Sequence, residues 1–126
     1  MGQAQRVLVV DDNVDAAKML ERLLQLNGKQ TRMAHSGLEA LDLAEQFRPH
    51  LILLDIGLPK LNGYEVCRRI REKPWGKDIV IIALTGWGQE EDRRRSREAG
   101  FNAHFVKPLE RAALMQVLRG DHPAAA

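Results

Sequence analysis

Short runs of consecutive apolar residues alternate along the chain with longer segments in which apolar residues recur every three or four positions. The short runs lack polar alternation, which is typical of strands buried on both faces of a parallel sheet. One run, at residues 29–34, is more polar and fits an edge strand. The predicted strands are residues 7–10, 29–34, 51–54, 79–84 and 103–106.

The longer segments have the periodicity of amphipathic helices. The predicted helices cover about residues 13–26, 37–47, 64–72, 89–99 and 109–118. Residues at helical spacing in the first two are expected to face the sheet: Met19, Leu20, Leu23 and Leu24, then Leu38, Leu41 and Ala44. The fourth helix has almost no apolar stripe, so we expect it to be weakly anchored.

Strict alternation of five strands with five helices predicts an α/β fold in which right-handed crossovers cover both faces of a parallel sheet. The length fits a flavodoxin-like, doubly wound (βα)5 domain with strand order 2-1-3-4-5. In that order the topological switch point lies between the first and third strands. Ligands of such folds bind at this crevice, outside the carboxyl ends of the strands.

The composition narrows the class of protein. The chain has 126 residues, which fits one domain over 6–119 with a short lead at 1–5 and a disordered tail at 120–126. A net charge of +2 is too small to indicate nucleic-acid binding. The single cysteine, Cys67, excludes an internal disulfide, and neither a signal peptide nor a membrane span is apparent. We therefore expect a cytoplasmic protein with no direct contact with membrane or nucleic acid.

Polar side chains follow four of the predicted strands. Asp11 and Asp12 follow the first strand, Asp55 the third, Thr85 the fourth and Lys107 the fifth. A single aspartate before a glycine can equally be a turn cap. Repetition of the pattern favours a site, because the carboxyl ends of parallel strands meet at one edge of the sheet.

Three neighbouring carboxylates repel one another unless a cation is present. A hard divalent ion such as Mg²⁺ prefers oxygen ligands of this kind, and a loop carbonyl and waters would complete the set. No cluster suits zinc or iron, because the four histidines are scattered, at His35, His50, His104 and His122. Lys107 and Thr85 are suited to binding phosphoryl oxygens, and an aspartate can form an acyl phosphate.

These residues together resemble the signature of response-regulator receiver domains, and the resemblance covers about residues 6–119. Each piece alone is weak, but the combination and its spacing are specific. The matching pieces are Asp11-Asp12, Asp55 with Leu58-Pro59 and Gly63, Thr85-Gly86, and Lys107-Pro108.

The resemblance implies a role for each site residue. Asp55 would accept a phosphoryl group from a sensor histidine kinase or a histidine phosphotransfer protein. Asp11, Asp12, Asp55 and the backbone carbonyl of Gly57 would bind Mg²⁺. Thr85 and Lys107 would bind the phosphoryl oxygens, and the Lys107-Pro108 peptide bond would be cis. The chain would then be a signalling domain and not an enzyme, apart from self-phosphorylation from phosphodonors and autodephosphorylation.

The resemblance also implies a switch. Thr85 would move toward the phosphoryl group, and an aromatic residue three before Lys107 would turn inward. These movements would change the affinity of one surface for an unknown downstream partner. That surface is formed by helix 89–99, strand 103–106 and helix 109–118. The sequence departs here, because His104 stands where Tyr or Phe is usual. His104 is either a pH-sensitive switch or a partly exposed strand residue. Gly57 and Trp87 occupy positions that influence phosphate lifetime in this family, and Trp87 could instead pack against helix 89–99.

Other functions remain open at this stage. A phosphatase of the haloacid-dehalogenase type would carry a second aspartate where this chain has Gly57. A nucleotide-binding module is a second alternative, because residues 86–91 begin like a glycine-rich fingerprint. Two features argue against it: the stretch ends in glutamate where the fingerprint has glycine, and the sequence contains no Walker lysine motif. The domain could also be a phosphate sink or relay, stand-alone or part of a hybrid kinase, or a phosphorylation-independent binding module. Four arginines of helix 89–99 are a candidate docking surface: Arg93, Arg94, Arg95 and Arg97.

Overall fold

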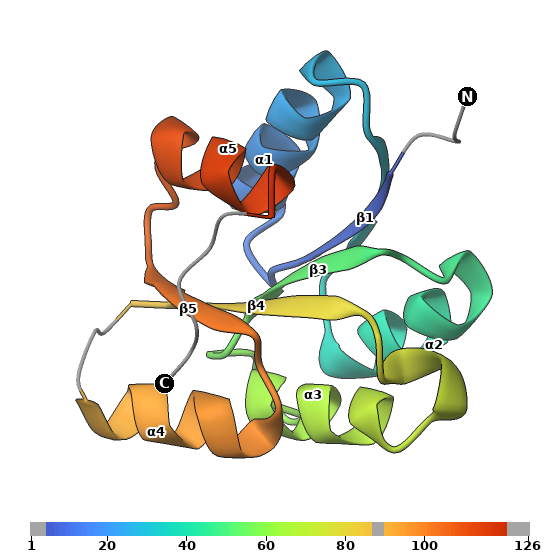
Figure 1. The fold of residues 1–126 in the computed structure, drawn as a ribbon, viewed down its shortest axis with the longest axis vertical. Helices are drawn as coiled ribbons and strands as arrows, with labels where there is room; N and C mark the ends of the chain where they lie inside the picture. The colour runs from blue at the N-terminus through green and yellow to red at the C-terminus, as the bar shows by residue number, and fades with distance from the viewer. Residues whose placement is uncertain (1–4, 87–89, 121–126) are drawn as a thin grey trace.

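The computed structural model describes residues 5–86 and 90–120, without the side chains of residues 90–92. In this part of the chain five strands alternate with five α-helices (Figure 1). The strands are β1 (Arg6–Val10), β2 (Gln30–Ala34), β3 (Leu51–Asp55), β4 (Val80–Thr85) and β5 (Ala103–Val106). The helices are α1 (Val14–Leu26), α2 (Gly37–Phe47), α3 (Gly63–Arg71), α4 (Glu90–Ala99) and α5 (Arg111–Leu118), with a 3-10 turn, η1, at Pro74–Gly76.

All strand pairs are parallel and the strand order is β2-β1-β3-β4-β5, which confirms the predicted fold. Asp55 is the last residue of β3 and lies opposite Leu84, while Thr85 ends β4 opposite Val106. The register therefore places the carboxyl ends of the central strands at one edge of the sheet.

Two layers of helices cover the sheet (Figure 1). Alternate residues of each strand point to opposite faces, so the apolar runs supply both cores. Leu8 and Ile52 pack toward α2, α3 and α4, whereas Val9 and Leu53 pack toward α1 and α5. The central strands are thereby buried on both sides, and the polar strand β2 lies at the edge.

The helices begin where the sequence contains capping residues. Asn13, Ser36 and Asn62 each accept a hydrogen bond from a backbone N–H in the first turn, as N-caps do. Glu39 completes the predicted capping box in a modified form, because its carboxylate accepts from the N–H of His35, one residue before the cap, at 2.6 Å.

Two predicted core residues are exposed. Met19 is 70% exposed and Leu38 is 66% exposed, so these predictions were wrong. Other residues of these helices are buried: Ala17 and Leu24 in α1, and Gly37, Ala40 and Ala44 in α2. Met19 and Leu38 lie two positions from Ala17 and Ala40, which is about 200° around a helix.

The buried side chains described on helix α4 are small. Ser96 and Ala99 are 0% and 2% exposed, whereas the described arginines of this helix are exposed. Helix α4 therefore buries few apolar side chains among its described residues, as the sequence predicts. Among the described residues, no helix has both the length and the apolar character needed to cross a membrane.

Candidate functional site

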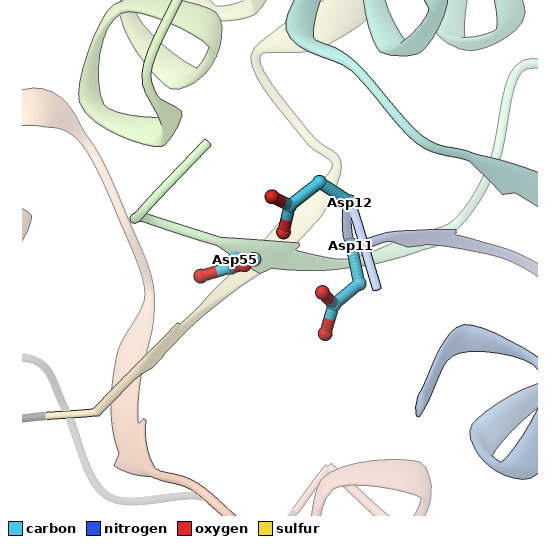
Figure 2. Close-up of side chains that lie close together, drawn as sticks. All are labelled: Asp11, Asp12 and Asp55. Atoms are coloured by element: carbon cyan, nitrogen blue, oxygen red, sulfur yellow. The ribbon is translucent and has the colours of Figure 1, made fainter. Parts of the chain in front are cut away.

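Three carboxylates meet at the edge of the sheet where β1 and β3 end (Figure 2). Oxygen atoms of Asp11, Asp12 and Asp55 all lie within 4.8 Å of one another. Asp11 and Asp55 are buried, at 2% and 6% exposure, while Asp12 is exposed. The sequence predicted this cluster, because the strands that precede these residues are neighbours in the sheet.

The two buried aspartates use their oxygens in the same way. Oδ1 of Asp11 accepts a hydrogen bond of 2.9 Å from the N–H of Asn13, and Oδ1 of Asp55 accepts one of 2.9 Å from the N–H of Gly57. Each bond closes an Asx turn that leads the chain out of its strand. The second oxygen of each carboxylate is directed to Lys107.

Lys107 joins the two buried carboxylates. Its Nζ lies 3.1 Å from Oδ2 of Asp11 and 3.0 Å from Oδ2 of Asp55. Its backbone N–H donates to the carbonyl of Thr85 at 2.7 Å, and the Lys107-Pro108 peptide bond is cis, as predicted. The ends of β4 and β5 therefore place Lys107 against two of the three carboxylates, Asp11 and Asp55.

Burial and charge act in opposite directions on these groups. Burial raises the pKa of Asp55 above its ordinary value, although the N–H of Gly57 and the ammonium of Lys107 partly offset this effect. Burial also disfavours the charged form of Lys107, but the hydrogen bonds and the charge attraction to Asp55 and Asp11 together outweigh it, so the pKa of Lys107 is raised. Lys107 alone therefore does not offset the cost of burying the ionised Asp55 carboxylate, and an added cation would stabilise the ionised form.

A cavity of about 310 Å³ opens beside Asp55. It is lined by residues from the ends of β3 and β4, the start of α3 and the middle of α4: Asp55, Ile56, Gly57, Asn62, Tyr64, Thr85, Gly86 and Arg95. A Cβ atom on Gly57 would lie 3.5 Å from Oδ1 of Asp55, and one on Gly86 would have no neighbour within 4 Å. Neither glycine places a side chain in the cavity that Asp55 lines.

The donor set fits a hard divalent cation. Asp11, Asp12 and Asp55 supply only oxygen atoms, and Gly57 follows Asp55 in the loop that lines the cavity. Carboxylate and carbonyl oxygens are the ligands that Mg²⁺ prefers, whereas zinc and iron sites use histidine or cysteine. The geometry is therefore compatible with the predicted ion.

The predicted switch residue lies against α4. His104 pairs in register with Ala83 and is half-buried, and its Nδ1 is 3.0 Å from Oγ of Ser96. The ring thus contacts the helix that the resemblance assigns to the switching surface, and its role as a switch stays a prediction. Trp87, the predicted modulator of phosphate lifetime, lies outside the described residues.

Several residues near the site were not predicted from the sequence. Tyr64 and Arg95 line the cavity beside Asp55, and Nδ1 of His35 lies 3.0 Å from the carbonyl oxygen of Asp11. Gly63 is part of the match to the receiver signature, and the structure gives the physical reason for a glycine there: a Cβ would lie 2.6 Å from the carbonyl oxygen of Asp55. The contacts of the other residues join elements that are far apart in the sequence, so no local sequence pattern indicated them. Only Gly63 could be identified from the sequence, through its place in the signature.

Comparison with known proteins identifies a family. The model of the response regulator receiver domain matches residues 7–119. The polar-differentiation response regulator DivK of Brucella anthropi is 38% identical over 103 residues, which are 82% of this chain and 84% of that protein.

Solved structures give the same result. The receiver domain of sensor histidine kinase PA1611 from Pseudomonas aeruginosa PAO1, with a magnesium ion coordinated in its active-site cleft, superposes with a TM-score of 0.85 at 35% identity and covers 93% of this chain and 96% of its own. The receiver domain of Saccharomyces cerevisiae Ssk1, crystallised with the histidine phosphotransfer protein Ypd1, has a TM-score of 0.85 at 28% identity, with 93% and 88% coverage.

Proposed function

The chain belongs to the family of response regulator receiver domains, and from this premise we propose that it accepts a phosphoryl group on Asp55 within a two-component system. The observation that carries the proposal is the position of Asp55. Its carboxylate lies between Lys107 and a cavity that Thr85 also lines, with two further carboxylates within 4.8 Å.

The proposed reaction is the transfer of a phosphoryl group from a phosphohistidine. An oxygen of Asp55 attacks phosphorus, the P–N bond breaks, the imidazole leaves and takes up a proton, and an acyl phosphate is formed. Lys107 and the Thr85 hydroxyl would donate hydrogen bonds to phosphoryl oxygens. A bound Mg²⁺, with Asp11, Asp12, Asp55 and the Gly57 carbonyl as ligands, would neutralise negative charge on the transferring group.

In this proposal the chain acts on no separate substrate. Its turnover is limited to self-phosphorylation from small phosphodonors and to hydrolysis of its own acyl phosphate. Gly57 supports this view, because it has no side chain to act as the acid or base of a haloacid-dehalogenase phosphatase, and it leaves a path for water to Asp55. The same open path is compatible with service as a phosphate sink or relay.

The proposed upstream partner is a sensor histidine kinase or a histidine phosphotransfer protein. Support comes from the neighbours, since one is the receiver domain of a sensor kinase and another was crystallised with a phosphotransfer protein. A downstream protein would bind the α4–β5–α5 surface, where Val106 is 42% exposed and the arginines of α4 are exposed. The buried, free thiol of Cys67 is consistent with the cytoplasmic location that this role requires.

The test is Mg²⁺-dependent phosphorylation by acetyl phosphate, followed by intact mass. We expect one added phosphoryl group on the wild type, none without Mg²⁺ and none on Asp55→Asn. Asp42→Asn is the matched control, because Asp42 is an exposed aspartate on α2. If the wild type gained no phosphoryl group from acetyl phosphate or from a phosphorylated phosphotransfer protein, the chain would be a phosphorylation-independent binding module.

A further inference from the structure

An arginine of α4 shares the cavity beside Asp55. Arg95 lines the same cavity of about 310 Å³ as Asp55 and Thr85. From the sequence, this arginine and its neighbours on α4 are a candidate docking surface for partners. All the described arginines of α4 are exposed, but Arg95 lines this cavity whereas Arg94 and Arg97 do not.

The guanidinium of Arg95 stacks on the ring of Tyr64. Its Cζ is 4.3 Å from the ring centroid of Tyr64, within the range of a cation–π contact. Tyr64 is only 5% exposed, and its ring meets that of Phe101 edge-on, with centroids 6.4 Å apart and an interplanar angle of 82°. Stacking engages the face of a guanidinium and leaves its N–H edge in a position to donate hydrogen bonds.

Lys107 does not offer a planar pair of donors to a phosphoryl group on Asp55. Lys107 is a compact point charge that already contacts both Asp11 and Asp55. A phosphoryl group on Asp55 would add negative charge and strong acceptor oxygens. A guanidinium matches such oxygens with two parallel N–H donors, which an ammonium cannot do. Arg95 is therefore chemically complementary to a phosphoryl group in this cavity.

We propose that Arg95 is a phosphoryl-binding residue that donates from α4 to the phosphoryl group of Asp55, and that Tyr64 positions its guanidinium. The inference rests on the proposed function, because it concerns the same acceptor. It gives α4 a direct contact with the modified site, in addition to any movement of Thr85 and His104. It also makes Arg95 a determinant of affinity for small phosphodonors, whose phosphoryl group enters the same cavity.

The experiment measures Mg²⁺-dependent phosphorylation over a range of acetyl phosphate concentrations. We expect Arg95→Gln to raise the half-saturating concentration about 5- to 20-fold, as the loss of a charge-assisted hydrogen bond at a partly exposed site would. Arg95→Lys should recover part of the loss, because it restores the charge without the fork. Arg94→Gln is the control and should match the wild type.

A second variant separates binding from helix anchoring. Arg95→Met keeps an apolar contact with the Tyr64 ring, since a thioether packs well on aromatic rings, but carries no charge. If Arg95 binds the phosphoryl group, Met should be as defective as Gln. The phosphoryl analogue beryllofluoride, titrated with Mg²⁺, should show the same order of affinities without any chemical step.

Two results would overturn the inference, and they differ from failure of the proposed function. Half-saturating concentrations for Arg95→Gln equal to those of Arg94→Gln would remove Arg95 from phosphoryl binding. A defect in Gln that Met restores would assign Arg95 to the anchoring of α4. In both cases the wild type is phosphorylated on Asp55, whereas a wild type that gains no phosphoryl group would refute both proposals together.

Discussion

Nζ of Lys107 lies 3.0 Å from Oδ2 of Asp55, so the proposed phosphoacceptor is ion-paired before any phosphoryl group arrives. The same Nζ lies 3.1 Å from Oδ2 of Asp11. One ammonium thus neutralises part of the charge of two buried carboxylates that come from different strands. Removal of the ammonium should therefore lower stability, whereas removal of the Asp55 carboxylate should not.

Lys107→Met should destabilise the domain in the absence of Mg²⁺. It leaves Asp11 and Asp55 buried without their cation, which should lower the free energy of unfolding by about 1–3 kcal/mol. Asp55→Asn should leave stability unchanged or raise it, because burial already disfavours the ionised carboxylate. Urea unfolding in EDTA measures both. Lys77→Met, at an exposed lysine, is the control, and equal stability of the two lysine variants would mean that the ion pairs contribute nothing net.

Gly63→Ala should damage both the fold and the site. A Cβ at Gly63 would lie 2.6 Å from the carbonyl oxygen of Asp55 and 2.7 Å from Cα of Ile56, and these backbone atoms cannot move without displacing Asp55. We expect a loss of about 1–3 kcal/mol in thermal or urea unfolding, together with slower labelling by acetyl phosphate. Gly86→Ala is the comparison, because its Cβ would meet nothing within 4 Å. Wild-type behaviour of Gly63→Ala would show that the α3 start can shift.

Arg71 connects several segments at the edge of the sheet away from the carboxylates. Its guanidinium donates at 2.7–2.9 Å to the carbonyls of Gly76 and Ile79, in the α3–β4 connection, and to the Gly100 carbonyl and Asn102 Oδ1, in the α4–β5 connection. A longer bond of 3.4 Å reaches the Lys77 carbonyl. Asn102 Oδ1 also accepts from the N–H of Ile81 at 2.7 Å. Removal of this side chain leaves part-buried acceptors without their donor.

Arg71→Met should therefore lower the free energy of unfolding by about 2–4 kcal/mol, measured by urea titration. Arg68→Met is the matched control on the same helix. Arg68 is exposed and, among the described residues, its ion pair is a surface one with Glu65 at 3.4 Å, so its loss should cost less than about 0.5 kcal/mol. Similar losses for the two variants would contradict a special role of Arg71.

Cys67 should react with thiol reagents only when the domain unfolds. The side chain is 0% exposed, and burial raises the pKa of its thiol from 9.0 to about 12. At pH 8 the rate of carboxamidomethylation should follow global unfolding and rise steeply with urea. Above pH 9 the unfolded thiol ionises while the folded one does not, so this group makes the domain progressively less stable up to about pH 12. Cys67→Ala should show a smaller loss of stability over that pH range.

The sequence by itself determined the fold and the acidic cluster. Uninterrupted apolar runs predict strands buried on both faces, and their alternation with helices predicts a parallel sheet. In such a sheet every strand ends at the same edge, so Asp11, Asp12, Asp55, Thr85 and Lys107 had to converge whatever the details of packing. Each of these predictions depends on the backbone pattern and on the order of the elements.

Only the tertiary structure decided which side chains of separate elements meet. Leu38 points to solvent because Ala40 packs on the sheet, and Arg95 reaches the cavity beside Asp55 because Tyr64 lies beneath it. Such contacts depend on sheet register and on how each helix is rotated against its neighbours. The side-chain packing of the whole core sets that rotation. The periodicity of one helix does not fix it, because neighbouring residues differ by about 100° around the helix axis and more than one of them can face the sheet.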